Sequence, residues 1–207
     1  GKGGYYTQED YKEIVAHAAK RFVTIVPEID MPSHINSALA AYGTLNNPDT
    51  KFPKDGNYTG PAETRGIIDG NSRPTDLYTG IGVGWSTLSL AKPNTLKFVN
   101  DVIRELAEIT PGPYLHIGGD EAQVTKKEEY IKFINQFSEI VKANNKKMIG
   151  WEEIAQADID GNAIAQHWAS EEYAATAASK GAKIIMSPSK KVYLDMQYDS
   201  TTRIGLH

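Results

Sequence analysis

Short apolar segments alternate with segments of helical periodicity along most of this chain. The apolar segments span residues 22–26, 114–117, 147–150, 163–168 and 182–186, and the first of them is rich in β-branched residues. Such alternation is typical of βαβ units, in which helices connect parallel strands and cover the sheet. The pattern therefore predicts an α/β protein with about five consecutive βα units.

Residues typical of helix ends indicate where the connecting helices begin and end. Thr7 and Asp10 resemble a capping box, and the helix that they open should end near Lys20, where a cation suits the negative end of the helix dipole. Pro93 precedes a second predicted helix over residues 94–109. A second capping box, Thr125 with Glu128, predicts a helix to about residue 144, and the last helix is expected near residues 171–180.

Two parallel architectures fit this alternation, the doubly wound open sheet and the (β/α)8 barrel. No glycine-rich phosphate loop follows the first strand-like segment, which disfavours a dinucleotide-binding sheet. Polar and aromatic residues gather instead just after several strands, where barrel enzymes build their sites. The prediction is an incomplete (β/α)8 TIM barrel: residues 1–207 form the central portion of one domain, with a long loop at about residues 43–92.

Composition narrows the functional classes. The formal net charge is -4, so the chain lacks the basic footprint of a nucleic-acid-binding protein, and we expect no nucleic-acid partner. The absence of cysteine excludes disulfides, thiol catalysis and cysteine-ligated zinc. No apolar run approaches the roughly 20 residues that cross a bilayer, so no membrane-spanning segment is expected. The oligomeric state is left open.

The stretch at residues 116–121, His-Ile-Gly-Gly-Asp-Glu, carries the strongest chemical signal. Two glycines after a buried strand allow the backbone to turn through conformations that other residues avoid. Because adjacent side chains on extended backbone point in different directions, Asp120 and Glu121 can serve different roles around one substrate. A bare Asp-Glu pair is most often solvated surface, but the aromatic residues that end the next strands favour a site here.

Several motifs resemble family 20 glycoside hydrolases, the β-N-acetylhexosaminidases, in the right order. They are the stretches at residues 3–7, 26–34, 116–121, 150–153, 167–168 and 193–195. In the second motif, Ser33 stands where the family usually has glycine. The resemblance implies removal of terminal β-linked N-acetylhexosamine from glycans, with N-acetylglucosamine favoured over N-acetylgalactosamine. It also implies substrate-assisted retaining catalysis, in which the substrate's own 2-acetamido oxygen is the nucleophile.

The same resemblance assigns residue roles. Glu121 is the expected general acid and base, and Asp120 is expected to hold the acetamido N–H and stabilise the oxazolinium intermediate. The expected substrate-binding residues are Trp151 and Trp168, which wall the acetamido pocket, Tyr193, which donates to the acetamido oxygen, Asp195, which binds a sugar hydroxyl, and His34 and His116, which support the site by hydrogen bonds. No cofactor and no metal are expected, although Glu28, Asp30 and His34 offer ligand types.

Two alternatives remain open from the sequence. The first is a carbohydrate-binding fragment without catalysis, against which the retained Asp120-Glu121 pair speaks. The second is another carboxylate-pair barrel hydrolase of the chitinase type, whose D-x-x-D-x-D-x-E pattern is absent. The resemblance further implies an extracellular or bacterial cell-surface location. It also implies that an arginine from earlier strands and a tryptophan and glutamate from a later strand complete the site outside these residues.

Overall fold

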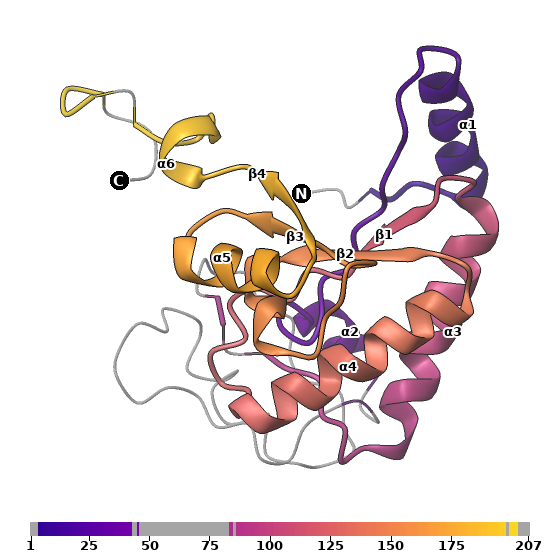
Figure 1. Ribbon diagram of the computed structural model, residues 1–207. Helices are drawn as coiled ribbons and strands as arrows, with labels where there is room; N and C mark the ends of the chain where they lie inside the picture. Colours follow the sequence, from indigo (N-terminus) through magenta and orange to yellow (C-terminus); the bar gives the residue numbers. More distant parts are fainter. Residues whose placement is uncertain (1–3, 43–44, 46–82, 85, 198, 203–207) are drawn as a thin grey trace.

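The computed structural model describes residues 4–42, 45, 83–84, 86–197 and 199–202 (Figure 1). These residues contain a four-stranded sheet in the order β1 (Tyr114–His116), β2 (Lys147–Trp151), β3 (Ile164–His167) and β4 (Lys183–Met186). All neighbouring strands are parallel. Parallel strands that follow chain order and are joined by helices match the predicted incomplete (β/α)8 barrel.

The helices connect the strands as the alternation predicts. They are α1 (Gln8–Ala19), α2 (Asn36–Ala41), α3 (Pro93–Ile109), α4 (Lys127–Ala143), α5 (Glu171–Ser179) and α6 (Ser189–Val192), together with the 3₁₀ helix η3 (Glu152–Gln156). The capping box of Thr7 and Asp10 is present at the start of α1. The sequence did not predict α2, η3 or α6, which are short and lack a long periodic apolar face.

The core lies between the sheet and the helices packed against it. Helix α4 contributes the largest share, and its Phe133 and Phe137 rings are fully buried with centroids 4.2 Å apart. Strand β2 buries three consecutive residues, Met148 to Gly150. A strand buried on both faces is expected to be apolar throughout, and this explains the short unbroken apolar runs seen in the sequence.

The predicted strand at residues 22–26 is wrong. Parallel pairing with β1 begins later, where the His116 N–H donates to the Pro27 carbonyl and the Ile29 N–H donates to the His116 carbonyl. Residues 24 and 25 run beside Gly112. The flanking Pro111 and Pro113 have no backbone N–H to offer a ladder. Phe22 is instead fully exposed, with a φ of 57°.

The predicted capping box of Thr125 and Glu128 is also wrong. Helix α4 begins at Lys127, and its N-cap residue, Lys126, makes no side-chain capping bond. The Thr125 hydroxyl lies 2.6 Å from the Thr87 hydroxyl instead. A long-range tertiary contact has therefore taken the side chain that a local capping bond would use.

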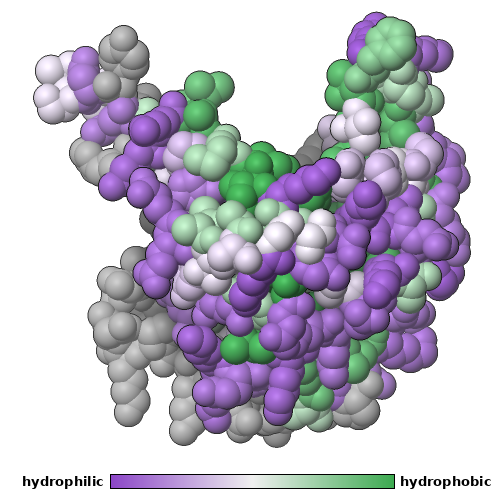
Figure 2. Space-filling view, in the orientation of Figure 1, coloured by the Kyte–Doolittle hydropathy of each residue, from purple (hydrophilic) through white to green (hydrophobic). Residues whose placement is uncertain are grey.

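Most of the long loop at residues 43–92 lies outside the described residues, so its expected role as a site wall stays a prediction. Figure 2 shows apolar surface gathered in the hollow between the regions around α1 and α6. Exposed apolar side chains lie near both edges of the sheet. Val23 and Val26 lie at the β1 edge, and Ile185 and Met186 lie in the edge strand β4. None of the described helices is long and apolar enough to cross a membrane.

Candidate active site

The loop that follows β1 turns sharply through left-handed backbone. The φ angles of Gly118, Gly119 and Glu121 are 70°, 96° and 48°. At Gly118 a Cβ atom would lie 1.9 Å from the Asp30 carboxylate, so no side chain fits there. The Ser33 hydroxyl donates to the Glu121 carbonyl at 3.2 Å. This turn places Asp120 and Glu121 at the carboxyl end of the sheet, as the sequence predicted.

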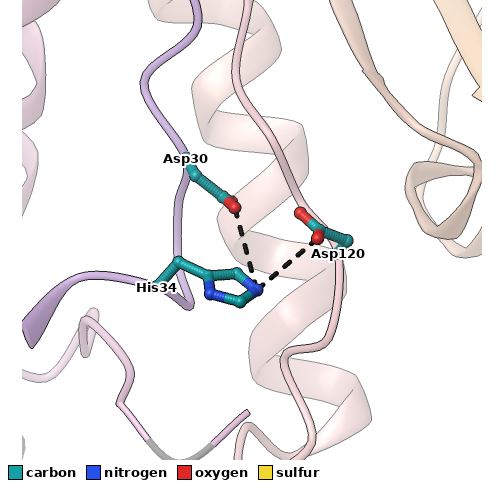
Figure 3. A group of neighbouring side chains, drawn as sticks. All are labelled: Asp30, His34 and Asp120. Carbon is teal, nitrogen blue, oxygen red and sulfur yellow. Dashed lines mark ion pairs between the residues drawn. The ribbon is translucent and has the colours of Figure 1, made fainter. Parts of the chain in front are cut away.

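Asp30 and Asp120 lie together in a partly buried position (Figure 3). The backbone N–H of Gly119 donates to Oδ1 of Asp30 at 3.1 Å. Burial, reinforced by the neighbouring Asp120 charge, raises the pKa of Asp30 to about 8. Burial also opposes ionisation of Asp120, but hydrogen bonds from His34 and Asp30 outweigh it and lower the pKa of Asp120. The pair therefore holds one proton at neutral pH, on Asp30, and Asp120 is the anion.

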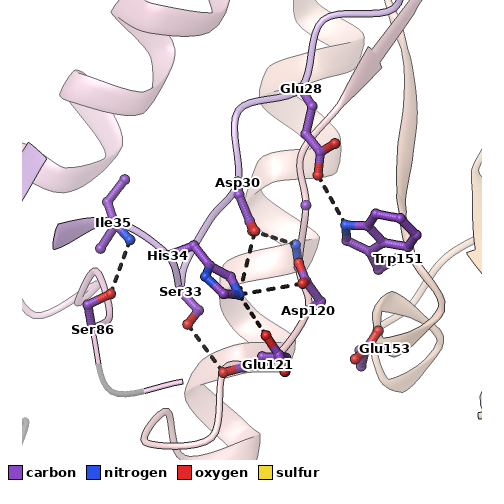
Figure 4. A network of polar contacts seen from close by, with 12 residues as sticks. Glu28, Asp30, Ser33, His34, Ile35, Ser86, Asp120, Glu121, Trp151 and Glu153 are labelled. Atoms are coloured by element: carbon purple, nitrogen blue, oxygen red, sulfur yellow. Dashed lines mark hydrogen bonds and ion pairs between the residues drawn. The ribbon is translucent and has the colours of Figure 1, made fainter. Parts of the chain in front are cut away.

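His34 lies among three carboxylates (Figure 4). Its Nε2 atom is 3.1 Å from Glu121 Oε2, 3.5 Å from Asp120 Oδ2 and 4.0 Å from Asp30 Oδ2. Hydrogen bonds to Asp120 and Glu121 raise the pKa of His34 to about 10, against the opposing effect of burial. His34 is thus an imidazolium at neutral pH, and it joins the two predicted catalytic carboxylates electrostatically.

The protonation of His34 disfavours metal binding at this cluster. Asp30, His34 and Asp120 offer ligand atoms within 4.8 Å of one another. This group shares two residues with the set of Glu28, Asp30 and His34 considered from the sequence. An imidazolium has donors only and cannot ligate a cation. The three side chains instead form an ion cluster in which the protonated His34 contacts the Asp120 anion.

His116 and Trp151 form a second layer beside this cluster. Nδ1 of His116 accepts from the backbone N–H of Gly118 at 3.0 Å, and burial lowers the pKa of the imidazole. The His116 and Trp151 rings meet edge to face with centroids 5.4 Å apart. The Trp151 indole N–H donates to Glu28 at 3.0 Å. His116 is therefore a neutral support for the glycine turn and for the Trp151 ring, while its expected role in substrate binding stays a prediction.

Trp168 follows β3 and lies next to Trp151, with ring centroids 6.5 Å apart. A cavity of about 410 Å³ is lined by Glu121, Glu153 and Trp168, among others. Burial, with the charges of Glu152 and Asp120, raises the pKa of Glu153 to about 7. Sequence reasoning assigned Glu153 no role, although its place in the motif at residues 150–153, directly after Trp151, was an available signal. Glu28 and Asp30 belong to the segment that bridges to β1 at Glu28.

Tyr193 and Asp195 follow α6. Burial raises the pKa of Tyr193, and the charges of Asp120, Asp195, Glu152 and Glu28 add to this effect. Tyr193 is therefore within electrostatic reach of the carboxylate site, although the sequence alone left its position open. Asp195 is exposed. The structure brings together His34, His116, Asp120, Glu121, Trp151 and Trp168, and it places Tyr193 near them with Asp195 at the periphery.

A partly buried carboxylate cluster at the carboxyl end of parallel strands, beside two tryptophans, is the arrangement of a barrel hydrolase. The family described as glycosyl hydrolase family 20, catalytic domain, matches residues 1–205, and the chain belongs to this family. It is 37% identical to a β-N-acetylhexosaminidase of Cellulomonas fimi over 100% of this chain and 38% of that protein. It is also 32% identical to a β-hexosaminidase of Porphyromonas gingivalis over 93% of this chain and 24% of that protein.

Solved structures give the same result. N-acetyl-β-hexosaminidase of Streptomyces plicatus, in complex with Thio-NAglucal, superposes with a TM-score of 0.84 at 41% identity and covers 100% of this chain. The β-N-acetylhexosaminidase of Streptomyces coelicolor superposes with a TM-score of 0.83 at 40% identity, again over 100% of this chain. The chain spans 38% of each of these two structures. The predicted family and fold are confirmed.

Proposed function

We propose that this chain supplies the central part of the catalytic domain of a retaining β-N-acetylhexosaminidase. The substrates would be glycans that end in β-linked N-acetylhexosamine, with N-acetylglucosamine favoured. The observation that carries the proposal is the contrast between adjacent acids: Asp120 is an anion paired with Asp30 and His34, while Glu121 lines the cavity with Trp168. A mutant β-hexosaminidase of Streptomyces plicatus in complex with its product GlcNAc supports the substrate class.

The chemistry follows from these positions. The acetamido oxygen of the substrate attacks the anomeric carbon and forms a C–O bond, while the bond from that carbon to the leaving oxygen breaks. Glu121 gives its proton to the leaving oxygen, and His34 Nε2, 3.1 Å from the Glu121 carboxylate, positions this side chain. The Asp120 anion holds the acetamido N–H and stabilises the positive oxazolinium ring.

Water then attacks the anomeric carbon of the oxazolinium ring. Glu121 takes the proton of that water, and the acetamido group is regenerated, so the sugar leaves with its configuration retained. Trp151 and Trp168 would wall the acetamido pocket, because large aromatic faces exclude water and fit a methyl group. Tyr193 would donate its hydroxyl to the acetamido oxygen, and Asp195 would bind a sugar hydroxyl.

The expected location is part of the proposal. By its resemblance to bacterial enzymes that trim glycans, we place the protein outside the cell or at the bacterial cell surface. The sequence that flanks this segment in the parent gene tests this placement: a secretion signal or a surface anchor would support it, and a cytoplasmic protein in fractionated cells would refute it.

The decisive test compares two chromogenic substrates with the full-length protein. The 4-nitrophenyl β-glycoside of N-acetylglucosamine should be hydrolysed, and the matching plain glucoside should be turned over negligibly because it lacks the nucleophile. A thiazoline that mimics the cyclic intermediate should inhibit strongly. Efficient hydrolysis of the plain glucoside, or trapping of a covalent sugar on Asp120, would refute the substrate-assisted mechanism. Binding without any turnover would favour a carbohydrate-binding protein.

A further inference from the structure

Trp168 is held by its backbone as well as its ring. The backbone N–H groups of Trp168, Ala169 and Ser170 all donate to the carboxylate of Glu152, at 2.6, 2.9 and 2.5 Å. Glu152 is completely buried. Three N–H donors at the start of α5 satisfy its negative charge, and the positive end of the helix dipole adds to this effect. Glu152 therefore joins the end of β2 to the turn that carries Trp168.

The indole ring has a contact of its own. Nε1 of Trp168 lies 3.3 Å from each carboxylate oxygen of Glu153, the next residue after Glu152. An indole N–H is only a donor, so the carboxylate is its acceptor. Glu153 lines the cavity together with Glu121 and Trp168. The ring is thereby fixed at one edge by Glu153 while it meets Trp151 edge to face at 73°.

Ionisation of Glu153 is unfavourable in this environment, chiefly because its carboxylate is buried. Burial raises its pKa to about 7, and the anions Glu152 and Asp120 contribute. Other ionisable side chains line the same cavity, namely Glu121, Lys127, Tyr130 and Tyr173. Among the described residues, the side-chain hydrogen bonds to the Glu153 carboxylate come from one indole N–H. A carboxylate that is costly to ionise, faces a cavity and has so little support is poorly explained by fold stability alone.

We propose that Glu152 and Glu153 form a two-point clamp that positions Trp168, with Glu152 holding its backbone and Glu153 holding its indole edge. Glu153 is then a positioning residue for the wall of the acetamido pocket. This inference rests on the proposed function. Its physical basis is that the acetamido group must approach the anomeric carbon in one orientation, so a loosely held wall weakens both binding and attack.

A double-mutant cycle on the full-length protein tests the clamp. Glu153→Ala should raise KM for the N-acetylglucosaminide, and the inhibition constant of the thiazoline, about tenfold, the effect of losing one charged hydrogen bond. Glu153→Gln keeps an acceptor oxygen and should stay within about threefold of wild type. Trp168→Phe removes the N–H, so Glu153→Ala in that background should add no further loss. Glu172→Gln, an exposed acid on α5, is the matched control and should change nothing.

An independent readout separates this inference from the proposed function. With ¹⁵N-labelled tryptophan, the indole cross-peak of Trp168 should move with pH around 7 in the wild-type protein and should not move in Glu153→Gln. An unchanged, pH-independent cross-peak in both proteins, or additive losses in the double mutant, would overturn the clamp. A normal cross-peak response in a full-length protein that hydrolyses no N-acetylhexosaminide would refute the proposed function alone.

Discussion

The imidazole of His34 lies 3.5 Å from the carboxylate of Asp120 and joins the segment that bridges to β1 at Glu28 to the turn that follows β1. This contact makes Asp120 an anion at a position where burial alone would favour its neutral form. It also keeps His34 protonated, since the pKa of the imidazole is raised to about 10. The charge state of the proposed catalytic pair thus depends on a residue outside its own motif.

Replacing His34 by Asn should move the acidic limb of the activity profile. Without the imidazolium, the pKa of Asp120 should rise, because an opposite charge at this distance favours ionisation. The acidic limb of kcat/KM in the full-length protein should therefore shift to higher pH. An acidic limb at the wild-type pH would show that His34 does not control the ionisation of Asp120.

Glu121→Gln should separate substrates by their leaving groups. The amide cannot donate the proton that a poor leaving group needs, so hydrolysis of a natural disaccharide should fall by about 100-fold or more. An aryl glycoside with a very acidic phenol should lose much less. The ratio of the two kcat/KM losses, measured on the full-length protein, is the readout, and equal losses would contradict the role of Glu121 as general acid.

Asp120→Asn should behave differently, because it damages the orientation and charge stabilisation of the nucleophile and leaves the acid in place. We expect kcat to fall for both kinds of leaving group by a similar factor, about 100-fold or more. Selective loss on poor leaving groups only would assign proton donation to Asp120 instead of Glu121. Thermal unfolding of the variant serves as the control for folding.

Glu153 should make stability depend on pH. Its pKa is raised from 4.5 to about 7 in the folded protein, so the unfolded chain loses this proton first as pH rises. The stability linked to Glu153 is fully present below about pH 4.5 and is lost as pH rises to about 7. Glu153→Gln should therefore flatten that part of the curve of unfolding free energy against pH. Superimposable curves would show that Glu153 titrates normally.

Phe137→Ala should destabilise the protein without a specific effect on chemistry. The ring is fully buried and packs on Phe133 in the core beneath the sheet. Loss of such a side chain costs about 3–5 kcal/mol through lost burial and the cavity left behind. Chemical denaturation measures this, while kcat of the folded fraction should change little. A loss under about 1 kcal/mol would mean that this core region is loosely packed.

Local pattern in the sequence was sufficient for the helix and strand order, the capping box of α1 and the family. Periodicity and end signals act over a few residues, so they need no knowledge of the rest of the chain. The motif at residues 116–121 likewise predicted two acidic residues directly after a buried strand. Local patterns gave the wrong result at residues 22–26, where Thr24 and Ile25 lie beside Gly112 in the proline-flanked turn before β1, and at Thr125, whose hydroxyl contacts the Thr87 hydroxyl.

The sequence by itself determined the order of helices and strands and the positions of the acidic and aromatic side chains between them. Only the tertiary structure decided which acids meet: Asp30 beside Asp120, His34 between the two motifs, and Glu152 and Glu153 against Trp168. The reason is physical. A side chain's type is local, but its proton, its charge and its orientation depend on burial and on neighbours that the fold brings from distant parts of the chain.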